Sequence, residues 1–276
     1  MTRSQGLRWL RHLGPKGMLG LLILLVIGLL TVAGPWLAPA DPLSVDLGAT
    51  LLPPGRGHWL GTDEFGRDIL SRLMAGARIT IGMSTLSVLF AVSVSVPMGI
   101  AAGYYRGRLD VLMMRFVDVL LSFPGALLAI ILISVLGPGL VSVIMAVAVF
   151  SIPTFARLTR GTALTLRNSD MVQAAVALGA SDARVLFRHI LLNSLVPVLV
   201  QASIRMGTVI LTVSSLSFLG LGPQPPAPEW GAMLSNARSY LYVAPHVAMA
   251  PGFATSLAII GFILFGEALI DRLALH

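Results

Sequence analysis

Residues 171–197 read MVQAAVALGASDARVLFRHILLNSLVP and lie between two long apolar stretches. Met171 to Leu178 consists mostly of good helix formers, and Gly179 can adopt the left-handed conformation that ends a helix. Ser181 is a residue type whose hydroxyl accepts a backbone hydrogen bond as the N-cap of a following helix. The stretch therefore predicts a helix, a glycine turn and a second helix, rather than an unstructured loop.

The composition is that of a membrane protein. Hydrophobic residues make up 56% of the chain and charged residues only 11%, whereas soluble domains carry roughly a quarter charged residues. About 20 apolar residues are needed to cross the hydrocarbon core. Six candidate spans meet this need: 18–37, 79–103, 113–136, 140–156, 195–221 and 248–270. The sequence thus predicts an all-α membrane protein with six transmembrane helices, the first too long for a signal peptide and therefore retained.

Basic residues gather on one side of these spans, in three groups: Arg3, Arg8, Arg11 and Lys16; Arg106, Arg108 and Arg115; Arg157, Arg160, Arg167, Arg184 and Arg188. The positive-inside bias makes this side cytoplasmic, so both termini are predicted to be cytoplasmic. The charges are scattered over short loops, which disfavours nucleic-acid binding. Tyr104 and Tyr105 fall near the predicted inner boundary, as in an aromatic belt.

Residues 58–78 read HWLGTDEFGRDILSRLMAGAR and belong to the predicted outer loop 38–78. Thr62 is expected to cap a helix whose first turn carries Asp63 and Glu64, which favourably face the positive end of the helix dipole. Asp68 and Arg72 have the i, i+4 spacing of a helical ion pair. We therefore expect an amphipathic helix on the outer face.

Residues 216–233 read LSFLGLGPQPPAPEWGAM. Glycines and then prolines follow the apolar run, so the fifth span is expected to end here. This string resembles SFLGLGxQPPxPxWGxM, and the 58–78 segment resembles HxLGTDxxGRDxxSRLxxGAR, of permeases in the dipeptide, oligopeptide and nickel ABC-importer family. Residues 171–197 resemble the EAA loop of such permeases, with Gln173 at the position of the family's glutamate. The likeness covers most of Trp59 to Asp271 and is closest to the second, C-type permease of the pair.

The resemblance implies a domain organisation and partners. It divides the chain into a cytoplasmic segment 1–17, a first transmembrane helix 18–37, an outer loop 38–78 and a permease core 79–276 with a coupling loop 157–194. The expected partners are a homologous second permease, two ABC ATPase subunits, a periplasmic or lipid-anchored solute-binding protein and membrane lipid. The implied location is the bacterial inner membrane. No cofactor is expected in this chain, since ATP and Mg²⁺ would be bound by the ATPase subunits.

The implied function is to form half of the translocation path of an ATP-driven importer for a dipeptide, an oligopeptide, nickel or a metal chelate. The 169–190 segment would contact the ATPases, through Gln173, Ala174, Ala175, Gly179, Ala180, Asp182, Arg184 and Arg188. A motif at the periplasmic face comprises Gly61, Thr62, Asp63, Gly66, Arg67, Asp68 and Arg72. Arg205 has two interpretations: it lines the translocation path, or it snorkels to the cytoplasmic interface.

The sequence also separates two mechanisms. A phosphate-binding loop needs GxxxxGK followed by Ser or Thr, but Lys16 is the only lysine and precedes Gly17. Neither a catalytic constellation nor a metal-ligand cluster stands out, so no catalytic or metal residue is predicted. The alternative function is an ion-gradient-driven secondary transporter, for which Asp118 is the single candidate coupling carboxylate. Arg115 and Asp118, at i and i+3, are expected to form a local pair.

Overall fold

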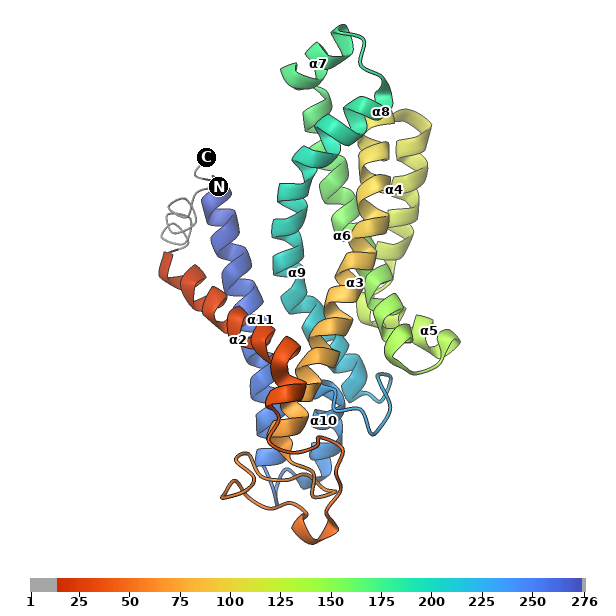
Figure 1. The fold of residues 1–276 in the computed structure, drawn as a ribbon. Coiled ribbons are helices and arrows are strands. Elements are labelled where there is room, and N and C mark those ends of the chain that lie inside the picture. Colours follow the sequence, from red (N-terminus) through yellow and green to blue (C-terminus); the bar gives the residue numbers. More distant parts are fainter. Residues whose placement is uncertain (1–13, 275–276) are drawn as a thin grey trace. The chain divides into compact units, whose positions relative to one another are not determined.

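The computed structural model describes residues 14–274, and in this range the chain consists of helices, turns and loops without a β-strand (Figure 1). Two isolated β-bridges lie in the loop before α3 and join Gly55 to His58 and Thr62 to Asp68. The helices of the described range are α2 (Gly14–Leu37), η1 (Leu47–Ala49), α3 (Ile69–Tyr105), α4 (Gly107–Ser122), α5 (Gly125–Leu136), α6 (Leu140–Arg167), α7 (Asp170–Ala177), α8 (Asp182–Arg184), the π-helix η2 (Val185–Leu191), α9 (Leu192–Phe218), α10 (Trp230–Ala237), η3 (Arg238–Tyr240) and α11 (His246–Ala274).

Five helical segments of the described range are long and apolar enough to cross a membrane: Gly14–Leu37, Ile69–Tyr105, Leu140–Arg167, Asp182–Phe218 and His246–Arg272. A sixth span exists only as the pair α4 and α5, which meet at a bend of 92°. Pro124 explains the break, because its ring excludes helical backbone at Phe123, which has φ −93° and ψ 136°. The third span predicted over 113–136 therefore corresponds to a broken helix, formed by α4 and α5 together.

Several helices extend beyond the predicted spans. α3 begins at Ile69, so the amphipathic helix expected in the outer loop is the first part of α3 rather than a separate element. α6 continues to Arg167. The predicted coupling loop 157–194 is therefore mostly helical, and only residues 168–169 and 178–181 within it are not helical. Of the predicted N-terminal segment 1–17, residues 1–13 lie outside the described range, and α2 begins at Gly14.

The chain forms two compact units. Of the described residues, the first unit contains 14–86, 132–144 and 203–274, and the second contains 87–131 and 145–202. In the first unit, α2 and α11 pack against each other (Figure 1). In the second unit, α3 and α6 approach closely at Gly99 and Gly103, where an added Cβ would lie 2.6 Å from the carbonyl oxygen of Ala156 and 2.7 Å from the Cβ of Ala163. Small residues four apart allow this close approach of two membrane helices.

Candidate functional site

The coupling segment 169–190 is a helix, a glycine turn and a second helix, as predicted, and it lies in the second unit (Figure 1). Gly179 has φ +82°, and its N–H donates to the carbonyl of Val176 at 2.9 Å. The N–H of Ala180 donates to the carbonyl of Ala175 at 3.0 Å. These two hydrogen bonds form a Schellman motif, which satisfies carbonyls left free at the end of α7. The predicted left-handed turn at Gly179 is confirmed.

Ser181 occupies the N-cap position of α8, with extended backbone at φ −68° and ψ 155°. Its side chain accepts no backbone hydrogen bond, so the expected cap bond is absent at this residue. Its carbonyl does accept from the N–H of Val185 at 3.0 Å and begins the helix. Because Ser181 is exposed, water can satisfy the first N–H groups instead of the hydroxyl.

Helix α8 passes directly into the π-helix η2 and then into α9, so one helical segment runs from Asp182 to Phe218. A π-helix has i→i+5 hydrogen bonds, and such turns are rare and frequently occur at functional sites. The coupling segment is thus joined to a candidate membrane span without a loop between them.

The tip of the coupling segment exposes large apolar side chains. Leu178 is 88% exposed at the end of α7, Val176 in α7 is also exposed, and Phe187 in η2 is 68% exposed. Two of the predicted coupling residues, Ala175 and Ala180, are half-buried. The other six are exposed: Gln173, Ala174, Gly179, Asp182, Arg184 and Arg188. The amide nitrogen of Gln173 donates to the backbone carbonyl of Asn168 at 3.1 Å. The tip therefore combines an apolar surface with surrounding charges.

Two ion pairs join α4 to α6 in the second unit. Arg160 donates to both carboxylate oxygens of Asp110, at 2.5 Å and 2.7 Å. Arg157 pairs with Asp118 at 2.7 Å, so the expected local pair of Asp118 with Arg115 is wrong. Arg157, which is distant in the sequence, pairs with the Asp118 carboxylate instead of the nearby Arg115. Arg115 lines a cleft of about 370 Å³ together with Asp110, Asp118 and Arg160.

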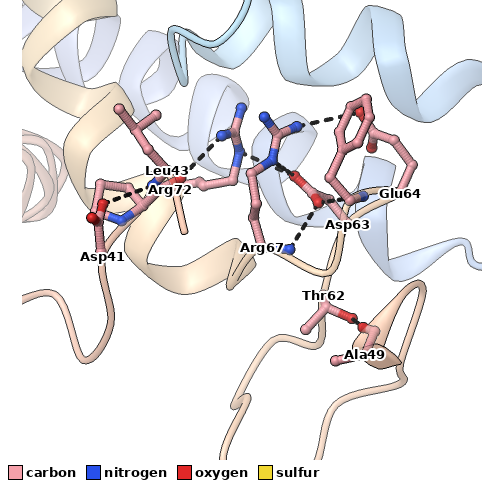
Figure 2. Close-up of polar contacts among 10 residues, drawn as sticks. Asp41, Leu43, Ala49, Thr62, Asp63, Glu64, Arg67 and Arg72 are labelled. Carbon is pink, nitrogen blue, oxygen red and sulfur yellow. Dashed lines mark hydrogen bonds and ion pairs between the residues drawn. The ribbon is translucent and has the colours of Figure 1, made fainter. Parts of the chain in front are cut away.

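The predicted periplasmic-face motif is a buried charge cluster in the first unit, which we call the 58–72 cluster (Figure 2). The Oδ2 of Asp63 lies 2.7 Å from Nε of Arg67 and 3.3 Å from Nε of Arg72. Arg67 also approaches Glu64 at 3.4 Å, and Arg72 donates to the carbonyl of Pro42 at 3.1 Å. Asp63, Arg67 and Arg72 are each at most 5% exposed. Removing one partner from such a buried pair costs about 3–5 kcal/mol.

The helix expected to start at Thr62 starts at Ile69 instead. The hydroxyl of Thr62 donates to the carbonyl of Ala49 and accepts from the N–H of Leu52, so it is not available as a cap. Asp63 accepts from the N–H groups of Phe65 and Arg67, which stabilises a turn in place of a helix.

Asp68 takes the capping position at the start of α3. Its Oδ2 accepts from the N–H of Ser71 at 2.8 Å and from the hydroxyl of Ser71 at 2.7 Å. Its Oδ1 lies 3.0 Å from Nδ1 of His58. The expected pair of Asp68 with Arg72 is therefore wrong. Glycines permit the compact turn before it, since Gly61 has φ +81° and Gly66 has φ +71°.

Glu229 is a buried acid that the sequence analysis did not identify. It caps α10, where its Oε2 accepts from the N–H of Ala232 at 2.8 Å. Its Oε1 accepts from the hydroxyl of Thr80 at 3.0 Å, and Thr80 Oγ1 accepts from the N–H of Trp230 at 3.2 Å. Burial raises the pKa of Glu229, against the opposing effect of the hydrogen bonds that its carboxylate accepts. The available signal was an acidic residue directly before a short apolar helix and after a run of prolines.

Arg205 lies within α9, which is continuous from Leu192 to Phe218, and its side chain is half-buried in the first unit. This position is compatible with both interpretations, a residue that lines the translocation path and a residue that snorkels to the cytoplasmic interface. The role of Arg205 stays a prediction.

Comparison with known proteins defines the family. Residues 95–275 match the family described as "Binding-protein-dependent transport system inner membrane component". Residues 15–54 match the "N-terminal TM domain of oligopeptide transport permease C". The chain therefore belongs to the family of binding-protein-dependent inner membrane transport components. It is a multi-span permease subunit of an ABC importer, and this family consists of transport components rather than enzymes.

Individual relatives narrow the position within this family. The chain is 49% identical over 220 residues to the "Glutathione transport system permease protein GsiD" of Pectobacterium atrosepticum, a match that covers 80% of this chain and 73% of the relative. It is 43% identical over 264 residues to the protein of the same name from Escherichia coli O6:K15:H31, covering 95% of this chain and 86% of the relative.

Solved structures show the same fold. A chain of the MetNI methionine ABC transporter in an inward-facing conformation has a TM-score of 0.59 at 20% identity, covering 72% of this chain and 95% of that chain. An amino acid ABC transporter has a TM-score of 0.53 at 15% identity, covering 74% of this chain and 94% of that chain. The broken third span and the helical coupling segment are thus set in an ABC-permease fold.

Proposed function

We propose that this permease subunit imports a peptide or a peptide-like solute and that its coupling segment 169–190 receives the force of two ABC ATPase subunits. The solute proposal is supported by the relatives named as glutathione permeases, and it includes dipeptides, oligopeptides and glutathione-like compounds. Nickel complexes are also included as candidate solutes, because the permease family that this chain resembles carries them. The proposed assembly also contains a homologous second permease and a periplasmic or lipid-anchored binding protein.

The observation that carries the coupling proposal is the apolar tip. Leu178, at the end of α7, exposes 88% of its surface, and Phe187, in η2 of the same folded helix pair, exposes 68%. Burying a leucine side chain contributes about 1.5–3 kcal/mol. A partner groove that covers this tip would therefore gain affinity from it. The continuous helix from Asp182 to Phe218 would carry a push on the tip into the membrane.

ATP and Mg²⁺ belong, in this proposal, to the ATPase subunits. The sequence contains one lysine, Lys16, and it is followed by Gly17 rather than by Ser or Thr. ATPase subunits lie in the cytoplasm, so this proposal also orients the chain with the coupling segment and both termini on the cytoplasmic side, as the positive-inside bias predicts.

Leu178→Asp tests the docking surface in the complete importer. The charge should weaken ATPase binding by about 10- to 150-fold, from the lost burial alone. Val243→Asp is the matched control, because Val243 is 79% exposed and lies outside the helices in the first unit. Affinity purification of the importer should yield ATPases with Val243→Asp but not with Leu178→Asp. Normal ATPase recovery with Leu178→Asp would contradict the coupling proposal.

Family membership leaves the secondary-transporter alternative with little support, and Asp118 is paired with Arg157 at an exposed position. Collapsing the proton gradient without depleting ATP should leave uptake intact. Loss of uptake under that treatment would favour the alternative.

A further inference from the structure

One buried tyrosine joins the end of α3 to the start of α8. The hydroxyl of Tyr104 donates to Oδ1 of Asp182 at 2.8 Å. Tyr104 is 9% exposed, whereas its neighbour Tyr105 is 50% exposed. Both tyrosines lie near the predicted inner boundary, as in an aromatic belt, but only Tyr104 is buried within the second unit.

The ring of Tyr104 is held on two sides. The guanidinium carbon of Arg167, the last residue of α6, lies 5.8 Å from its centroid, within the range of a cation–π contact. The ring of Tyr105 packs edge-on at 5.1 Å between centroids. The direction of the Tyr104 hydroxyl toward Asp182 is therefore set by packing as well as by the hydrogen bond.

Asp182 lies between two irregular points of the coupling segment. The left-handed turn at Gly179 precedes it, and η2 (Val185–Leu191) follows it after a single helical turn. Helices bend preferentially at π-type turns. A displacement of α7 and α8 must pass through η2 to reach α9, whereas Asp182 lies before η2. The bond from Asp182 to Tyr104 thus gives the tip a direct connection to α3.

The receiving helix is suited to carry such a displacement. α3 continues without a break from Tyr105 back to Ile69. At Gly99 and Gly103 its backbone packs closely on α6, near Ala156 and Ala163. Close backbone packing resists sliding of one helix on the other, so a shift at the end of α3 moves the pair together.

We propose that Tyr104 is a positioning residue, which passes the movement of the coupling segment to α3 through its hydrogen bond to Asp182. This inference rests on the proposed function of segment 169–190 as the ATPase contact. It assigns Tyr104 to transmission, not to binding of the ATPases or the solute.

The test uses the complete importer in liposomes and a single cysteine in the otherwise cysteine-free chain. Ala101→Cys places the thiol on α3, and the measurement is its rate of reaction with a water-soluble maleimide, with and without ATP and Mg²⁺. ATP hydrolysis is measured in the same samples. Tyr104→Phe removes only the hydroxyl, and Tyr105→Phe is the matched control.

Tyr104→Phe should reduce the ATP-dependent change in labelling by about two- to tenfold, as expected for loss of one hydrogen bond of typical net strength at a partly exposed position. Hydrolysis should continue, and Tyr105→Phe should leave the labelling change unaltered. Asp182→Asn, whose amide oxygen still accepts from tyrosine, should preserve the change better than Asp182→Ala.

Three results would overturn the inference: no ATP-dependent labelling change in the parent protein, an unaltered change in Tyr104→Phe, or an equal loss in Tyr105→Phe. Loss of the ATPases from Tyr104→Phe would also overturn it, since the residue would then act on assembly. The proposed function has its own readout in Leu178→Asp. If Leu178→Asp releases the ATPases and Tyr104→Phe behaves as the parent, the transmission role alone fails.

Discussion

Replacing Gly179 by valine changes the backbone at the tip without creating a clash. Gly179 has φ +82°, and a Cβ at this position would meet nothing within 4 Å. The cost is therefore conformational: a left-handed residue with a side chain costs about 1–2 kcal/mol, and β-branched residues are poorly tolerated there. This reduces the population of the native turn by roughly 5- to 30-fold relative to competing conformations.

The assay is solute-stimulated ATP hydrolysis by the complete importer, with membrane insertion of the variant checked by fractionation. Gly179→Val should insert normally and lose stimulation, while Gly179→Asn should retain part of it because asparagine tolerates left-handed backbone. Gly137→Val is the matched control, since Gly137 has φ +84° and equally open surroundings but lies outside the coupling segment. Full stimulation in Gly179→Val, or equal loss in Gly137→Val, would refute the reasoning.

Three further outcomes are expected. Ala175→Arg places a bulky charge at a half-buried position of α7 and should block ATPase assembly, which co-purification measures; normal recovery would count against the packing. If Arg205 lines an aqueous path, Arg205→Cys should react with water-soluble thiol reagents, and failure to label in every nucleotide state would exclude that interpretation. Because burial raises the pKa of Glu229, the folded state binds this proton more tightly than the unfolded state. Its contribution to stability is greatest below the ordinary glutamate pKa of about 4.3 and is lost as pH rises through the raised value. Thermal unfolding across this range should therefore depend less on pH in Glu229→Gln, and an identical pH dependence would contradict the assignment.

Local signals in the sequence identified the coupling segment. The turn at Gly179 depends on a residue without a Cβ and on hydrogen bonds to the carbonyls of Ala175 and Val176, all within six consecutive residues. Such interactions are visible as a short pattern. The hydrophobic runs likewise located the membrane helices, since length and apolarity alone define a candidate span.

Contacts between distant residues caused the errors. The start of α3 depends on Thr62 bonding to Ala49 and on Asp63 closing a turn, which no helical periodicity reveals. Asp118 pairs with Arg157 rather than with Arg115, its neighbour on the same helix. Pro124 is a helix breaker that is visible in the sequence. The sequence does not reveal the angle of the break, which is 92° in the structure.

The burial of two individual polar residues, Tyr104 and Glu229, was also not predicted. Tyr104 and Tyr105 are identical in type and adjacent, so pattern alone cannot tell which one points into the second unit. Glu229 lies in a proline-rich connection, and its buried carboxylate accepts a hydrogen bond from Thr80 of α3, 149 residues away in the sequence. The burial of both residues results from tertiary packing, which a local sequence pattern does not show.

The central claim is that this chain is a permease subunit, which gates a path while other subunits supply energy and solute. The most direct measurement compares the purified chain alone in liposomes with the same chain joined by a second permease, both ATPases and the binding protein. Alone, it should show no ATP hydrolysis and no uphill uptake, and the complete set should show both. Uphill uptake by the isolated chain, driven by a proton or sodium gradient without ATP, would contradict the account.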